Sequence, residues 1–337
     1  MEILENYDLT KLNTFGIHAK GKFFVEIAKE SDISELFRMP IFKDNKKLFL
    51  GGGSNILLSQ DFDGLVVLNK LGGVEIINED DKSVLIRSMS GVVWHDLVTF
   101  AVDRGYWGIE NLSLIPGTVG GAPMQNIGAY GMEIKSIIEQ VEAYSTETGE
   151  KKIFENQECK FGYRDSVFKN ELKDKYFISA IVMKLSKEDN RNVTYKVLKE
   201  HLEKNNIEVI CSKDISEAVA DIRRSKLPDP KVIGNAGSFF KNVFVSKDQL
   251  ERLLKENPAM PYFEEGGIIK VPAGWLIEQC GWKGKQIGAV GVHDKQALVL
   301  VNHGGATGEE VKNLAQDIII SVFTKFGLRL SPEVNLI

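Results

Sequence analysis

The amino-acid sequence predicts an α+β fold in which a strand-rich N-terminal half, itself in two pieces, precedes a smaller α+β unit. The 337 residues are enough for two or three domains of ordinary size. Short apolar segments separated by turns fill the first half and are typical of strands. Helix signals come close together after about residue 206. Hydrophobic residues make up 43% of the chain and charged residues 26%, as in a globular protein with buried cores.

Strands in the N-terminal half are predicted where Val, Ile, Leu and Phe gather, at residues 22–28, 47–50, 65–71 and 83–88. A helix is predicted over residues 92–104, because Val93, Leu97 and Ala101 recur every four residues and Gly105 can end it. Residues 137–144 and 150–154 predict a hairpin, and residues 176–185 a long apolar strand.

The C-terminal part begins with a change of composition. Residues 186–206 are polar and rich in Lys, Glu and Asn, which suggests a linker or an exposed excursion. Asp214 can cap a helix that carries Ile215, Val219 and Ile222 on one face. Further helices are predicted over residues 246–256 and from the capping box of Thr307 and Glu310 to about Lys325, with Gly327 beyond.

Charge and composition exclude several classes of function. The 42 Lys and Arg against 47 Asp and Glu give a net charge of −5, which disfavours a nucleic-acid partner. No apolar run approaches the length of a membrane span, and the acidic first residues predict no signal peptide. Cys159, Cys211 and Cys280 fit neither a disulfide framework nor a metal site, so we expect buried thiols, no metal and a cytoplasmic protein.

Glycine is concentrated in two segments. Residues 51–55 read Gly-Gly-Gly-Ser-Asn directly after a strand, where consecutive N–H groups can face an anion. The spacing is neither that of a P-loop nor that of a Rossmann turn, and a tight connection would look the same. Residues 115–131 combine glycine, proline and amide or hydroxyl side chains with little charge. A polar ligand lying along this loop would satisfy its backbone groups, so we favour a ligand-binding loop.

Together with residues 13–17 (Asn-Thr-Phe-Gly-Ile), these segments resemble the flavin-binding half of the UDP-N-acetylenolpyruvoylglucosamine reductase (MurB) family, and the resemblance continues over nearly the whole chain. It implies a two-part FAD-binding region of the vanillyl-alcohol-oxidase (PCMH) type and a C-terminal α+β substrate-binding domain. The implied division is an FAD-binding subdomain at residues 1–70, joined by residues 328–337 returning toward the active site. A second subdomain would span residues 71–205, and a substrate-binding domain residues 206–327.

The resemblance implies non-covalent FAD held mainly by the backbone of the two glycine-rich segments. The implied FAD contacts are Gly51, Gly52, Gly53, Ser54, Asn55, Pro116, Gly117, Thr118, Gly120, Gly121, Gln125, Asn126, Gly128, Ala129, Tyr130 and Gly131.

Three residues match the family's catalytic positions. Arg164 lies between aromatic and small residues, where a surface pair with Asp165 is the alternative interpretation. Ser238 follows Gly237 in a motif unlike the G-x-S-x-G of hydrolases, and Glu333 follows a proline near the C-terminus, where a glutamate is usually solvated. The resemblance implies that Arg164 and Glu333 stabilise developing negative charge while Ser238 donates a proton.

The implied reaction is the NADPH-dependent, FAD-mediated reduction of UDP-N-acetylglucosamine enolpyruvate to UDP-N-acetylmuramate in peptidoglycan precursor synthesis. Positions matching the family's UDP-sugar contacts are Tyr195, Lys226, Asn242, Tyr262, Lys270 and Gln296. Tyr195 resembles the mobile tyrosine of the subclass with an extra loop, although a half-exposed linker aromatic would look the same. The family's behaviour also implies a monomer without a membrane partner.

Two residues depart from the family's pattern: Val243 stands where proline is common, and Asn335 where arginine is frequent. Two alternative functions stay open at this point. One is another FAD oxidoreductase of the same fold with a different substrate, and the other is a non-catalytic nucleotide-sugar or flavin-binding protein. Binding alone would not require the set of Arg164, Ser238 and Glu333.

Overall fold

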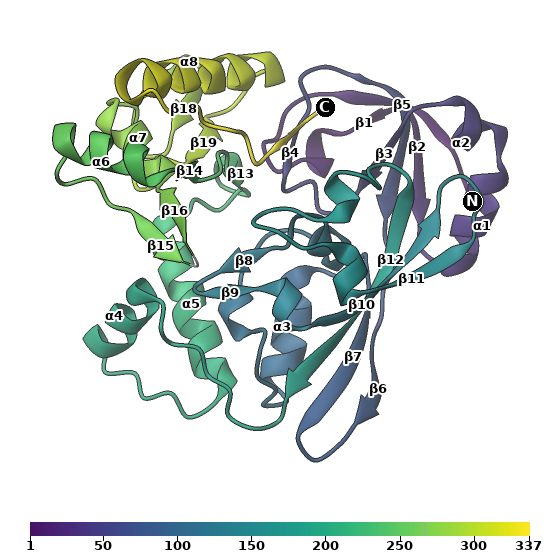
Figure 1. The fold of residues 1–337 in the computed structure, drawn as a ribbon. Helices are drawn as coiled ribbons and strands as arrows, with labels where there is room; N and C mark the ends of the chain where they lie inside the picture. Colours follow the sequence, from purple (N-terminus) through teal and green to yellow (C-terminus); the bar gives the residue numbers. More distant parts are fainter. Residues whose placement is uncertain (266) are drawn as a thin grey trace. The chain divides into compact units, whose positions relative to one another are not determined.

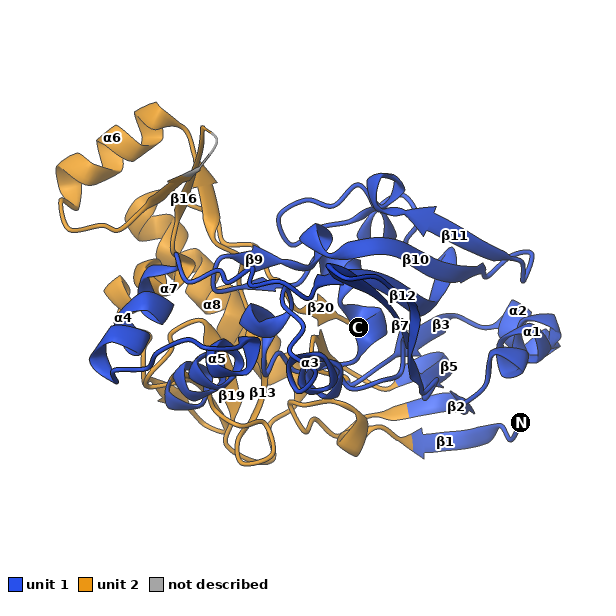
Figure 2. Ribbon diagram, turned by 90° about the horizontal axis from the view of Figure 1, so that it is seen from below, with its two compact units in different colours: residues 1–7, 21–52, 62–225 blue, residues 8–20, 53–61, 226–337 orange. Residues whose placement is uncertain are grey.

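A computed structural model describes residues 1–265 and 267–337 and divides the chain into two compact units (Figure 2). Unit 1 comprises Met1–Tyr7, Gly21–Gly52 and Phe62–Ser225, and unit 2 comprises Asp8–Lys20, Gly53–Asp61 and Lys226–Ile337. Both units contain helices and sheets, so the predicted α+β class is confirmed. None of the helices in the described ranges combines the length and the hydropathy that a membrane span needs.

Unit 1 begins with a four-stranded sheet in the order β1-β2-β5-β3 (Figure 1). Its strands are β1 (Leu4–Asp8), β2 (Lys20–Ile27), β5 (Phe62–Asn69) and β3 (Lys47–Leu50). β5 pairs in parallel with both β2 and β3, and its last six residues are buried, as expected of a central parallel strand. Apolar residues of α1 (Glu30–Arg38) and α2 (Pro40–Asp44) complete the core of this sheet.

The second sheet of unit 1 is antiparallel and has the order β11-β10-β12-β7-β6. It consists of β11 (Lys151–Glu155), β10 (Ile138–Ser145), β12 (Tyr176–Ser186), β7 (Ser83–Met89) and β6 (Val74–Glu79). The buried face of α3 (Trp94–Val102) shares one core cluster with β7, β10 and β12. The predicted hairpin, long strand and helix are therefore confirmed. A small hairpin of β8 (Gly128–Ala129) and β9 (Met132–Glu133) lies at the end of the second glycine-rich segment.

Helix α4 (Lys196–Lys204) occupies part of the segment that the sequence suggested to be a linker or exposed excursion. Leu198 and Leu202, four residues apart, are buried against the apolar face of α5 (Ser212–Lys226). The sequence did not predict this helix, because its narrow apolar stripe lies within a polar segment. Asp214 supports α5 from inside its first turn, because its Oδ2 accepts the N–H groups of Ile210 and Cys211 at 2.8 Å each.

Unit 2 contains two larger sheets and a short parallel pair. The first sheet has the order β13-β19-β18-β17, made of β13 (Gly234–Ser238), β19 (Val299–Asn302), β18 (Val290–Val292) and β17 (Gln286–Ile287). The second is β14-β16-β15, made of β14 (Val243–Val245), β16 (Ile268–Val271) and β15 (Phe263–Glu265). The short pair joins β20 (Asn335–Leu336) to β4 (Ile56–Leu57).

Three helices build the core of unit 2: α6 (Lys247–Glu256), α7 (Ala273–Gln279) and α8 (Gly308–Phe326). The predicted capping box of α8 is confirmed, because Thr307 Oγ1 accepts the N–H of Glu310 at 3.2 Å and Glu310 Oε2 accepts the N–H of Thr307 at 2.7 Å. Gly327 ends α8 with a left-handed φ of 66°. The buried face of α8 packs with α7 and β19 in one cluster.

Candidate active site

Two glycine-containing loops of unit 1 pack directly on each other. Gly51 and Gly52 follow β3, and a Cβ atom added to Gly52 would lie 3.0 Å from the Cα atom of Gly117. A Cβ atom added to Gly51 would overlap the side chain of Thr118. A side chain at either position would therefore force Thr118 or the backbone of Gly117 to shift.

The same loops leave backbone donors and space for a ligand. Within the described ranges, no hydrogen bond uses the N–H groups of Gly51 and Gly52. A Cβ atom added to Gly121 would meet no atom within 4 Å, so the backbone there borders open space. Successive N–H groups of this kind bind anions such as a diphosphate. These residues therefore fit the phosphate-bearing part of a nucleotide cofactor. Gly53, Ser54 and Asn55 belong to unit 2, where the C=O of Gly53 accepts the N–H of Thr14 at 3.1 Å.

The start of the second loop is fixed from two sides. Leu114 has a left-handed φ of 57°, its N–H donates to His95 Nδ1 at 3.1 Å, and its C=O accepts from Arg223 Nε at 3.2 Å. Burial lowers the pKa of His95, which keeps Nδ1 available as an acceptor at neutral pH. The N–H of Trp94 donates to the C=O of Gly117 at 3.0 Å, so the loop enters its turn in one defined position.

Asn126 uses both ends of its buried side-chain amide within the protein. Its Nδ2 donates to Glu133 Oε2 and to the C=O of Gly162 at 2.9 Å each, and its Oδ1 accepts the N–H of Lys135 at 3.1 Å. The sequence predicts Asn126 as an FAD contact. In the structure its amide ties the glycine-rich loop to the turn that carries Arg164.

Arg164 occupies that turn with a left-handed φ of 52°, a conformation that is costly for a residue with a side chain. Mutual backbone hydrogen bonds of Gly162 and Asp165, at 3.0 and 3.3 Å, hold the turn. Arg164 Nη2 donates to the C=O of Gly128 at 2.7 Å, which aims the guanidinium along the glycine-rich loop. The structure thus directs Arg164 onto the predicted cofactor loop.

Arg223 is a neighbour of the predicted site residues Tyr130 and Arg164 that the sequence did not predict. Burial lowers the pKa of its guanidinium, nearby Tyr130 opposes that effect, and nearby Arg164 adds to it. Two guanidinium groups close to each other attract an anion. The run Arg223-Arg224-Ser225-Lys226 is a sequence signal for such a cluster, although the resemblance implies a role only for Lys226.

Unit 2 brings the other two predicted catalytic residues onto neighbouring segments. Ser238 ends β13 after Gly237, whose φ is 68° and whose N–H donates to Asn235 Oδ1 at 2.9 Å. The N–H of Glu333 donates to the C=O of Phe239, the residue after Ser238, at 2.8 Å. Arg164 belongs to unit 1, so the three residues are held by two separately described units.

The predicted substrate contacts fall in different elements. Tyr195 belongs to unit 1 and places its ring edge-on to Tyr130, with ring centroids 5.6 Å apart. The other five lie in unit 2: Lys226 at the end of α5, Asn242 before β14, Tyr262 before β15, Lys270 in β16 and Gln296 before β19. Asn242 Oδ1 accepts the N–H of Ala273 at 3.1 Å, and so caps α7. Lys270 faces Phe244 and Phe263 across its two neighbouring strands.

The two departures from the family's pattern have structural roles. Val243 begins β14 and pairs with Val271 of β16, so a residue with an N–H group fits the ladder at this position. Asn335 donates to the C=O of Asn55 from both its backbone N–H and its Nδ2, at 3.0 Å each. It therefore joins β20 to the segment that follows the three consecutive glycines.

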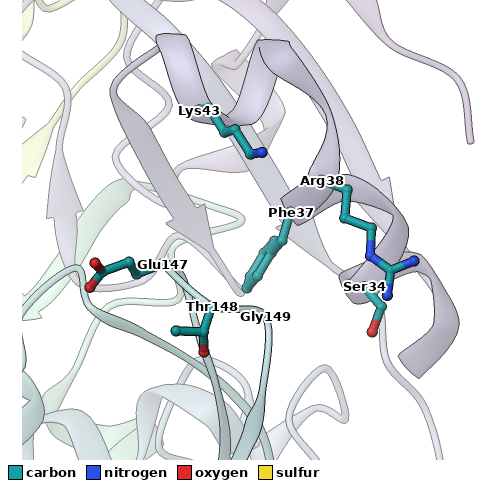
Figure 3. A pocket seen from close by; sticks show the side chains of 7 residues that line it. All are labelled: Ser34, Phe37, Arg38, Lys43, Glu147, Thr148 and Gly149. Atoms are coloured by element: carbon teal, nitrogen blue, oxygen red, sulfur yellow. The ribbon is translucent and has the colours of Figure 1, made fainter.

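A small cavity of unit 1, about 110 Å³, contains none of the predicted site residues (Figure 3). It is lined by Ser34, Phe37, Arg38, Lys43, Glu147, Thr148 and Gly149. Most of these side chains are exposed, and we place the candidate site at the glycine-rich loops instead.

Comparison with known proteins supports the same assignment. Residues 22–152 match the model of an FAD binding domain, and residues 229–337 match that of the C-terminal domain of UDP-N-acetylenolpyruvoylglucosamine reductase. A UDP-N-acetylenolpyruvoylglucosamine reductase of Flavobacterium johnsoniae is 48% identical over 100% of both chains. One of Neisseria gonorrhoeae is 47% identical over 97% of this chain and 95% of its own.

The chain belongs to the UDP-N-acetylenolpyruvoylglucosamine reductase family. A solved structure of a family member, the MurB protein of Thermus caldophilus, has a TM-score of 0.66 at 22% identity, covering 99% of this chain and 98% of that one. A solvent-stable cholesterol oxidase has a TM-score of 0.52 at 10% identity over 98% of this chain and 86% of its own. These two likenesses support the predicted fold of an FAD-binding region of the vanillyl-alcohol-oxidase type with a C-terminal α+β domain.

Proposed function

We propose that this chain is an FAD-dependent reductase that converts UDP-N-acetylglucosamine enolpyruvate to UDP-N-acetylmuramate with NADPH. The observation that carries this conclusion is the 48% identity to a reductase over the full length of both chains. Residues 22–152 match an FAD binding domain, which supports FAD as the cofactor. The product is a precursor of peptidoglycan, so the enzyme acts in cell-wall synthesis.

FAD, when bound, carries the hydride equivalent of NADPH to the substrate. The residues that fit its phosphates are Gly51 and Gly52 with the facing loop of Gly117, Thr118 and Gly121, whose glycines leave backbone groups and space for a ligand. Further contacts from the predicted set are assigned as Gly53, Ser54, Asn55, Pro116, Gly120, Gln125, Asn126, Gly128, Ala129, Tyr130 and Gly131. For Asn126 we assign the backbone, because its amide is engaged by the protein.

The chain's own side chains would handle the charge and the proton of this reaction. Reduction adds a hydride equivalent to the terminal vinyl carbon and a proton to the carbon that bears the carboxylate. Negative charge develops toward that carboxylate between the two additions. In the proposed mechanism the Arg164 guanidinium would stabilise this charge directly, and Glu333 would do so as the neutral acid, whose O–H can donate a hydrogen bond. Preorganised groups of this kind supply much of a typical rate enhancement. Ser238, presented after the left-handed Gly237, donates the proton.

Substrate binding is assigned to Tyr195, Lys226, Asn242, Tyr262, Lys270 and Gln296. Lysine ammonium groups suit the diphosphate, and tyrosine rings suit the sugar or the uracil. The three-part division at residues 1–70, 71–205 and 206–327 is retained as a proposal. The two sheets of unit 1 have two core clusters, although Phe177 of β12 belongs to the cluster of the first sheet. The pairing of β20 with β4 supports the return of residues 328–337. We also propose a monomer in the cytoplasm. The three free cysteines fit a reducing compartment, although only Cys159 is buried as expected, whereas Cys211 and Cys280 are half-buried.

The replacement Ser238→Ala tests the proposed chemistry. It removes the proton donor while leaving the backbone unchanged, so NADPH should still bleach the flavin at the wild-type rate. Turnover of the enolpyruvyl sugar should fall at least about 100-fold, the contribution typical of a positioned acid. The matched control is Ser331→Ala, because Ser331 is an exposed serine of the same unit with no assigned role.

Unimpaired turnover by Ser238→Ala would remove the serine from the mechanism. If the wild-type protein binds FAD and is reduced by NADPH but accepts only other enones, it is a different FAD oxidoreductase of this fold. If it binds FAD and neither substrate reacts, it is a non-catalytic flavin-binding protein.

A further inference from the structure

Asn111 joins two segments of unit 1 that are distant in the sequence. Its side chain is fully buried, at 0% exposure. The two Nδ2 hydrogens are both used, because Nδ2 donates to the C=O of Tyr130 at 2.9 Å and to the C=O of Asn192 at 2.8 Å. One carbonyl belongs to the predicted cofactor loop, and the other to the segment of residues 187–195 that leads to Tyr195. We refer to residues 187–195 as the strap.

Asn192 provides a second bond between the same two segments. Its Nδ2 donates to the C=O of Gly131 at 3.0 Å, next to the carbonyl that Asn111 holds. Its Oδ1 accepts the hydroxyl of Thr194 at 2.8 Å, which orders the chain just before Tyr195. Asn111 thus bridges the strap to the backbone of Tyr130 with two hydrogen bonds, and Asn192 bonds the strap directly to the backbone of Gly131 with a third.

The chain after Tyr195 is fixed independently. Leu198 and Leu202 of α4 are buried with Trp107 and Ile215 in one cluster. Tyr195 itself is 39% exposed, and its ring meets the edge of Tyr130. Any movement of Tyr195 is therefore confined to the few residues between Asn192 and Leu198.

The unused end of the Asn111 amide points to a role beyond packing. Its Oδ1 is buried and has no hydrogen-bond partner among the described residues. An unpaired buried acceptor is unfavourable, and an apolar residue of similar size would avoid it. The presence of an asparagine at this position is therefore explained by its two N–H donors, which connect the cofactor loop to the strap.

We propose that Asn111 is a positioning residue that clamps the strap to the cofactor loop, so that Tyr195 is held ready for the UDP-sugar substrate. This inference rests on the proposed function only in the identity of that substrate. The clamp acts through Tyr195 and Tyr130 and touches no reacting atom. Its loss should therefore weaken binding of the sugar and leave reduction of the flavin by NADPH intact.

Steady-state and half-reaction kinetics of the full-length, FAD-loaded protein test the clamp. For Asn111→Ala we expect KM for the enolpyruvyl UDP-sugar to rise about tenfold, consistent with the loss of two hydrogen bonds. The rate of anaerobic flavin bleaching by NADPH should stay within about twofold of wild type. The matched control is Asn156→Ala, since Asn156 Nδ2 also bridges two carbonyls of unit 1, Lys135 at 2.8 Å and Ile138 at 2.7 Å, away from the strap.

Limited proteolysis gives a readout that needs no substrate. Trypsin can cut the bond after Arg191, directly before the clamped Asn192. We expect this cut to be about tenfold faster in Asn111→Ala than in wild type, and unchanged in Asn156→Ala. Asn192→Ala removes the exposed bond to Gly131 together with the exposed bonds that its Oδ1 accepts from Thr194, and it should give a smaller increase than the loss of the buried Asn111 side chain. It decides the matter if Asn111→Ala does not fold.

An unchanged cleavage rate in a folded clamp variant would overturn the clamp. A general structural defect should slow flavin reduction by NADPH and flavin reoxidation by the sugar by the same factor. Such an equal loss in the clamp variant would overturn the positioning role of Asn111. If wild-type protein fails to reduce the enolpyruvyl sugar, the proposed function is wrong, whereas faster cleavage of the variants still supports the clamp.

Discussion

Replacing Gly52 with alanine probes the contact between the two glycine-rich loops. The added Cβ atom would lie 3.0 Å from Gly117 Cα, 3.5 Å from its carbonyl carbon and 3.7 Å from its nitrogen. These are backbone atoms, so no side-chain rotation relieves the contact. Gly117 cannot easily retreat, because its C=O accepts the N–H of Trp94 at 3.0 Å. The loops must therefore separate by a few tenths of an ångström.

The expected magnitude follows from two opposing effects. Forcing an extra methyl group into close-packed structure costs about 1–3 kcal/mol. Alanine also restricts the unfolded chain, which returns about 0.4–1 kcal/mol. We expect a net loss of roughly 1–2 kcal/mol in the free energy of unfolding. If the displaced backbone binds FAD, a similar loss appears in FAD binding, and about 1.4 kcal/mol corresponds to a tenfold weaker Kd.

The assay is a titration of apoprotein with FAD, followed by quenching of flavin fluorescence, together with thermal unfolding of the apoprotein. Gly72→Ala is the control, because an added Cβ atom there lies no closer than 4.0 Å to another atom. It should leave both quantities nearly unchanged. An FAD Kd within twofold of wild type for Gly52→Ala, with unaltered unfolding, would refute the close approach of the loops and their role as the cofactor cradle.

Two further predictions concern buried charges of unit 1. Arg87→Ala should destabilise the protein by about 1–3 kcal/mol, measured by denaturant unfolding, because it removes two 2.7 Å bonds to the buried carboxylate of Glu142, which retains Lys151 Nζ as a partner at 2.7 Å. A loss below about 1 kcal/mol in the free energy of unfolding would contradict this role of Arg87. For Glu110, burial raises the carboxyl pKa, so its stabilising contribution is complete below about pH 4.5 and is lost as pH rises through the folded-state pKa. Glu110→Gln should therefore gain stability relative to wild type between pH 4.5 and 8, and a constant difference across that range would argue against the assignment.

The sequence predicted elements whose signals are local. The capping box of Thr307 and Glu310 with the terminal Gly327 located α8 almost to the residue, because each signal acts within one helical turn. Helix α4 was harder to predict, since only Leu198 and Leu202 interrupt a polar segment. Its stability comes from packing on α5, and that partner lies later in the chain.

For the glycine-rich segments, the structure adds a physical reason that the sequence did not indicate. The sequence suggested backbone that approaches a ligand. The structure shows in addition that Gly52 lies directly against the backbone of Gly117 of the same unit, where little room is left for a Cβ atom. The unusual backbone of Arg164 and the bond from its guanidinium to Gly128 depend on tertiary contacts that spacing does not encode. Asn111 could not be predicted for the same reason, because its partners are distant in the sequence.

Anaerobic stopped-flow absorbance at the flavin band tests the central claim most directly. Purified protein should carry FAD, NADPH should bleach it, and addition of the enolpyruvyl UDP-sugar in a second mix should restore the oxidised spectrum while UDP-N-acetylmuramate forms in equal amount. A protein that is bleached by NADPH but is not reoxidised by this sugar in the absence of oxygen would contradict the proposed reductase.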